Sequence, residues 1–134
     1  MSVNINQIIQ LLQERLVAVR EIKRLTEELE EVLTRNDKVS AELLLSMRAK
    51  EIEKAAECTE EILGMKRQGT KNATIVARLM GPEPSIYLEE SEAWSQEEKR
   101  VYELRYLTQK LLDETKELDR NLNRRVAGEK SFYH

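Results

Sequence analysis

Carboxylates are the residues of this chain best suited to chemistry, and they come in two dense groups. The two groups comprise Glu27, Glu28, Glu30 and Glu31, and then Glu53, Glu57, Glu60 and Glu61. Paired carboxylates transfer protons or bind hard metal ions only where they converge and lose water. Here they lie between apolar residues at helical spacing, so we expect them on solvated outer faces. The pattern favours neither an acid–base centre nor a metal site.

The other reactive residues lack partners in the sequence. The chain has one histidine, the terminal His134, and one cysteine, Cys58. A catalytic Ser–His or Cys–His pair needs a positioned imidazole, and a chain end seldom provides one. We expect Cys58 to be a small, partly buried helix residue, because no neighbour in sequence would activate its thiol. The sequence therefore predicts a protein that is not an enzyme and that uses no cofactor.

Charge and hydropathy exclude further classes. The net charge is -3, and no basic face dominates, so no nucleic-acid partner is expected. The basic loop of Lys66, Arg67 and Lys71 could touch phosphate, but three charges in a loop are ordinary. No window approaches the roughly 18 consecutive apolar residues of a membrane span. A single cysteine and no signal peptide at the N-terminus predict a cytoplasmic protein.

Four helices are predicted to position these residues within a single domain of 134 residues. Charged residues make up 35% and aromatic residues 4%, which is typical of long solvated helices. Apolar residues recur every three or four positions, and Gly, Pro and Asn interrupt the pattern. The predicted helices cover about 4–36, 39–67, 72–80 and 95–127. We expect an all-α fold, an antiparallel helical bundle or coiled-coil hairpin with two long outer helices and a short middle helix. Within that middle helix, Ile75-Val76 leaves a brief extended segment open.

The two long helices differ in their apolar bands. The band of the first is wider than a two-stranded coiled-coil seam, so we expect it to contact more than one helix. Arg15 interrupts this band, and it either extends to solvent at the edge or fixes register with a partner. Thr108 and Thr115 dilute the seam of the last helix. The last helix is therefore expected to be the mobile or partner-binding element, and the first two helices the scaffold.

The segment 81–94 is predicted to be irregular and acidic. It holds both prolines, the only tryptophan and four glutamates, with no basic residue. Ser95 and Glu98 after it form a capping box that starts the last helix. Trp94 either packs on the first turn of that helix or forms, with Tyr87, an exposed docking strand.

The layout resembles the small helical chaperones of bacterial flagellar export, the FlgN-like and FliT-like families. The resemblance lies in the long first helix, the second helix with its run Val39-Ser40-Ala41-Glu42-Leu43-Leu44-Leu45-Ser46-Met47-Arg48, and the charged last helix. It implies a cytoplasmic chaperone that holds an amphipathic helix of a hook-associated subunit and keeps that client unassembled. The residues best placed for client contact would be Leu107, Leu111, Leu118 and Leu122, with Tyr87 and Trp94. Alternatively, all four leucines are intramolecular core.

A second hypothesis is a self-associating structural or adaptor module, such as a coiled-coil homodimer. Its apolar seams would be used entirely within the dimer, which would leave no groove for a client.

Overall fold

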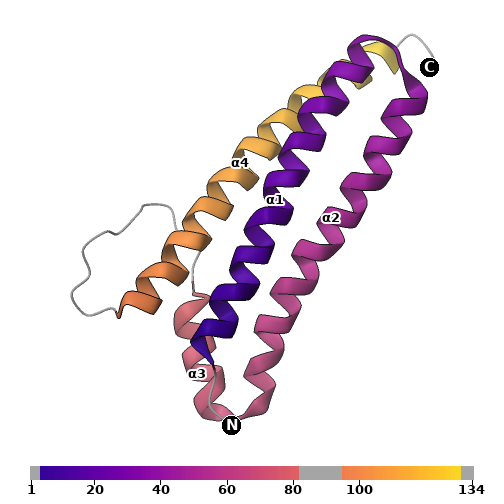
Figure 1. Cartoon of the computed structure of the whole chain (residues 1–134). Coiled ribbons are helices and arrows are strands. Elements are labelled where there is room, and N and C mark those ends of the chain that lie inside the picture. The colour runs from indigo at the N-terminus through magenta and orange to yellow at the C-terminus, as the bar shows by residue number, and fades with distance from the viewer. Residues whose placement is uncertain (1–3, 82–94, 131–134) are drawn as a thin grey trace.

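The described part of the chain is entirely helical. The computed structural model describes residues 4–81 and 95–130, apart from the side chains of residues 70 and 125–130. Its helices are α1 (Ile5–Thr34), α2 (Lys38–Gly64), the 3₁₀ turn η1 (Met65–Gln68), α3 (Thr70–Leu79) and α4 (Gln96–Lys130). No strand occurs in these ranges. The predicted all-α class is therefore confirmed, and Figure 1 shows three long helices side by side with α3 at one end.

A tight turn reverses the chain between α1 and α2. Asn36 adopts a positive φ of 60°, a conformation that asparagine tolerates better than most residues. Asp37 then caps α2, because its Oδ1 accepts the backbone N–H of Ser40 at 3.1 Å. The Ser40 hydroxyl also donates to Asp37 Oδ2 at 2.6 Å, and this hydrogen bond, with that from the Ser40 backbone N–H, favours the ionised carboxylate and lowers the pKa of Asp37. The antiparallel return predicted for this turn is what the structure shows (Figure 1).

The short helix differs in its bounds from the prediction. The second helix ends at Gly64, and η1 carries the chain to Gln68. Gly69 then takes a φ of 142°, which a residue with a side chain rarely adopts. As a result α3 begins at Thr70, and Asn72 is buried rather than serving as a cap. The extended alternative for Ile75-Val76 is wrong, since both residues lie within α3.

The last helix begins as predicted and ends later. Ser95 Oγ accepts the backbone N–H of Glu98 at 3.2 Å, which confirms the capping interaction. The helix runs through the expected end at Ala127-Gly128 and continues to Lys130. The rest of the acidic segment, 82–94, with Tyr87 and Trp94, lies outside the described residues.

The first long helix is the centre of the molecule. It packs against α2 along one side and against α4 along the other, while α2 and α4 make few contacts with each other. This arrangement explains the wide apolar band of α1, which serves two partner helices. None of the helices in the described ranges is long and apolar enough to cross a membrane.

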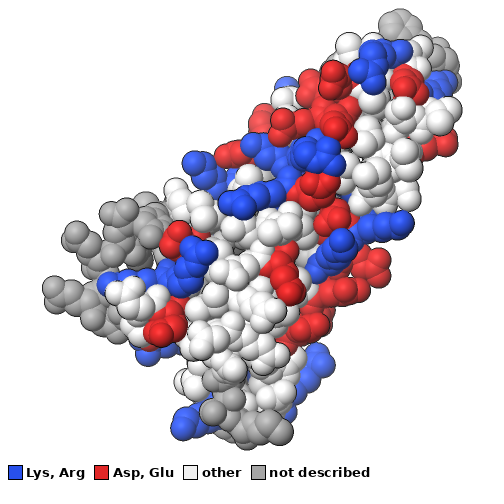
Figure 2. All heavy atoms as spheres, viewed as in Figure 1, with Lys and Arg blue, Asp and Glu red and all other residues white. Residues whose placement is uncertain are grey.

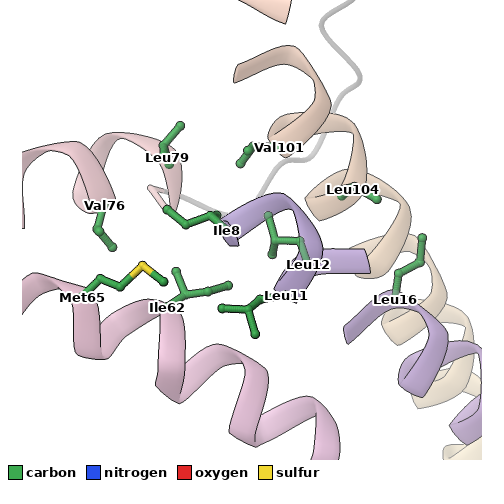
Figure 3. Close-up of a cluster of buried hydrophobic side chains, with 10 residues drawn as sticks. All are labelled: Ile8, Leu11, Leu12, Leu16, Ile62, Met65, Val76, Leu79, Val101 and Leu104. Atoms are coloured by element: carbon green, nitrogen blue, oxygen red, sulfur yellow. The ribbon is translucent and has the colours of Figure 1, made fainter. Parts of the chain in front are cut away.

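Two hydrophobic clusters hold the helices together. The larger cluster lies at the α3 end, where all the helices contribute side chains that point toward one another (Figure 3). Its buried members are Ile8, Leu11, Leu12, Leu16, Ile62, Met65, Val76, Leu79, Val101 and Leu104. The smaller cluster joins α1, α2 and α4 near the α1–α2 turn, through Leu25, Leu29, Val32, Ala41, Leu44 and Leu122.

Three threonines on the packed faces of α1 and α4 are part of the interior. Thr26, Thr108 and Thr115 are all buried. Each hydroxyl donates to the backbone carbonyl four residues earlier, at 2.7 Å, so none is left without an acceptor. Thr108 and Thr115 therefore interrupt the apolar seam of α4 without leaving a hydroxyl unsatisfied, and α4 packs along α1.

Candidate partner-binding groove

A groove of about 300 Å³ lies between α2 and α4, with α1 as its floor. Three helices contribute to its lining, which comprises Arg15, Val19, Ile22, Arg48, Ile52, Ala55, Ala56, Thr59, Leu112, Thr115, Lys116 and Asp119. The groove exists because α2 and α4 both pack on α1 rather than on each other. It is the natural site for a further helix, since helices in bundles pack into the hollow between two neighbours.

Apart from Arg15 and Arg48, the floor and the α2 wall of the groove are largely apolar. Val19 and Ile22 are buried at the floor. Ala55, Ala56 and Thr59 line the α2 wall, and their small side chains leave room for those of a partner. A surface of this kind gains free energy when a second apolar face covers it.

An ion pair joins α2 to α4 at the groove. Arg48 Nη2 donates to Asp119 Oδ2, and the two side chains are 18% and 32% exposed. Arg48 Nε is buried and meets no acceptor among the described residues. The lining therefore contains three cations, Arg15, Arg48 and Lys116, but Asp119 is its only carboxylate.

The second helix leaves several of its large apolar side chains exposed. Its large exposed apolar residues are Val39, Leu43, Leu45, Met47 and Ile52. Figure 2 shows an uncharged area over the N-terminal half of α2. Ile52 is 47% exposed and lies on the groove wall, whereas Leu43, nine residues earlier, lies on the opposite flank of the helix.

A second hollow, of about 500 Å³, lies between α1 and α4 and is acidic. Its lining consists of Lys23, Glu27, Glu30, Glu114, Glu117 and Leu118. Lys23 Nζ binds Glu114 Oε2 at 2.6 Å, which lowers the pKa of the carboxyl and raises that of the amine. The described residues contain no acidic, histidine or cysteine group arranged to hold a metal ion. This charged hollow is less suited than the groove to an apolar helix face.

The predicted contact leucines lie on a different flank of α4 from the groove. Leu122 is buried in the smaller cluster, and Leu107 and Leu111 pack against the larger one. These three leucines therefore agree with the alternative that the leucines of α4 belong to the intramolecular core. Leu118 is half-buried at the acidic hollow. From α4 the groove instead takes Leu112 and Lys116, which sequence reasoning did not single out. Of the irregularities noted in the sequence, Arg15 and Thr115 line the groove.

The thiol of Cys58 lies in an environment that suppresses its reactivity. The side chain is buried, and burial is the main cause that raises its pKa. The nearby carboxylates of Glu14 and Glu61 act in the same direction. A raised pKa reduces the thiolate fraction, so the environment favours a packing role for this residue.

No protein-family model, no curated protein and no solved structure matches this chain. Its function is therefore argued from the groove itself.

Proposed function

We propose that this chain is a non-enzymatic binding protein that holds an amphipathic helix of a client protein in the groove between α2 and α4. The observation that carries the proposal is the open groove with its apolar floor and half-exposed Ile52. Helix-in-groove recognition needs an elongated apolar surface between two helices, into which a client inserts side chains spaced three and four residues apart.

The size of the apolar contact supports a reversible complex. Covering the exposed half of Ile52 contributes on the order of 1 kcal/mol, since full burial of such a side chain contributes about 1.5–3 kcal/mol. Several contacts of this size along the groove would reach micromolar affinity only if the client helix is largely preformed, because ordering it costs free energy.

The resemblance to flagellar export chaperones supplies the client class. We propose that the client is an amphipathic helix of a hook-associated flagellar subunit, kept unassembled in the cytoplasm. This part of the proposal rests on helical layout and on the groove. In this proposal the client contacts the wall formed by α2 rather than the leucines of α4 that the sequence suggested.

Substitution of Ile52 tests the groove. Ile52→Asp places a charge on the apolar wall, so we expect at least a tenfold loss of affinity for the terminal helices of hook-associated subunits. The matched control is Val17→Asp, which introduces the same charge at a 62% exposed apolar residue of α1 outside the groove. Binding is measured by calorimetry with purified subunits. If both variants bind as the parent chain does, the groove is not the client site.

Self-association remains the second candidate, and the exposed apolar flank of α2 favours it. Val39, Leu43 and Met47 lie four residues apart and are exposed on the side of α2 opposite Ile52. Light scattering separates the two functions. A tight dimer that binds no flagellar subunit, and that becomes monomeric on Leu43→Lys, would replace the chaperone proposal.

A further inference from the structure

We infer that the helix held in the groove carries carboxylates along its edge facing α4 and apolar residues along its edge facing α2. This inference rests on the proposed function and names the chemistry of the client. It follows from the unequal character of the two groove walls.

The α2 wall is apolar apart from Arg48 at one position. Ile52, Ala55 and Ala56 contribute hydrocarbon, and Thr59 Oγ1 donates to the carbonyl of Ala55 within its own helix. A polar or charged client residue facing this wall would lose water without gaining a hydrogen bond. The client edge against α2 must therefore be apolar.

The α4 wall presents a cation that has no partner among the described residues. Lys116 is exposed, and no described residue forms an ion pair or hydrogen bond with it. Asp119, the only carboxylate of the lining, is already bound to Arg48. A client carboxylate near Lys116 would form the ion pair that the described residues do not supply.

The charge of the groove lining is opposite in sign to the net charge of the whole chain. The net charge is -3, yet the groove lining has three cations and one carboxylate. On the other flank of α4, the acidic hollow has four glutamates and one lysine. A basic helix would be attracted to that acidic side and repelled from the groove, so the two flanks discriminate between clients by charge.

Two designed peptides test the inference with the full-length chain. Both are amphipathic helices with the same leucine–alanine face, and the residues beside that face are glutamates in one and lysines in the other. At low salt we expect the glutamate peptide to bind about two- to fivefold more tightly for each ion pair that it forms. Because the pairs are exposed, this preference should shrink at high salt. Fluorescence anisotropy measures both affinities.

Charge reversal on α4 assigns the preference to the groove. Lys116→Glu should abolish or invert it, whereas Lys110→Glu makes the same change on an exposed residue of α4 outside the groove and should preserve it. The inference is overturned if Lys116→Glu leaves the preference intact or if the parent chain binds both peptides equally. If the parent chain binds both peptides equally and Ile52→Asp weakens both, the groove is still the binding site and only the inferred client chemistry is wrong. If neither peptide binds, both proposals fail.

Discussion

The ion pair between Arg48 and Asp119 should respond very differently to loss of one partner or the other. Asp119→Ala leaves a guanidinium that is only 18% exposed without its carboxylate, and Arg48 Nε already lacks an acceptor. Leaving such a donor unsatisfied costs about 1–3 kcal/mol when fully buried, so the partial exposure of Arg48 reduces the expected cost to about 1–2 kcal/mol. Arg48→Met keeps the apolar stem and leaves Asp119, which is 32% exposed, to water.

For Arg48→Met we therefore expect a change in unfolding free energy within about 1 kcal/mol of zero, because removing the cation also removes the buried Nε donor. Urea unfolding followed by circular dichroism measures both variants, and the double variant gives the coupling between the two sites. The reasoning is refuted if Arg48→Met destabilises the chain as much as Asp119→Ala does. That outcome would mean that the strength of the ion pair, rather than the cost of burying its cation, governs this site.

Two further predictions concern the packing of α4. Thr108→Val should stabilise the chain by between zero and about 1 kcal/mol, because the lost hydroxyl shares its carbonyl acceptor with a backbone N–H of the helix and a buried methyl replaces it. Urea unfolding measures this change. Clear destabilisation would show that the hydroxyl has another partner. Glu114→Gln should lower the thermal midpoint at neutral pH. Since Lys23 lowers the pKa of Glu114, the stabilisation is present above the ordinary pKa of a glutamate and is lost as pH falls through the lowered native pKa. Thermal melts of parent and variant should therefore converge in acid, and a gap that persists there would exclude the ion pair as its cause.

Sequence reasoning located the helices well because their signals are local. The capping serine Ser95 and the turn at Asn36-Asp37 depend on residues within one helical turn, and both mark helix ends in the structure. The placement of the carboxylates between apolar positions likewise follows from helical periodicity. Short-range signals of this kind fix where a helix begins and which broad face is apolar.

The proposed binding groove could not be located in this way because its position depends on which flank of each helix is covered. Leu112 and Leu118 are both half-buried leucines of α4, six residues apart, yet one lines the groove and the other the acidic hollow. Periodicity places them about 120° apart on the helix and says nothing of which neighbour each one meets. The threonines illustrate the same limit, since Thr108 and Thr115 read as interruptions but bind their own helix in the interior.

The architecture fits the binding function that we propose. A bundle closes its core when four long helices surround it, but here α1 has only α2 and α4 along its length. The remaining helix, α3, has 10 residues against the 30 of α1, and it contributes only to the cluster at one end. Beyond that end, the described helices leave the groove open to solvent, with Ile52 half-exposed on its α2 wall. A client helix that completes the bundle would have to obey the same apolar spacing as the missing fourth helix, and its binding would stabilise the chain by mass action.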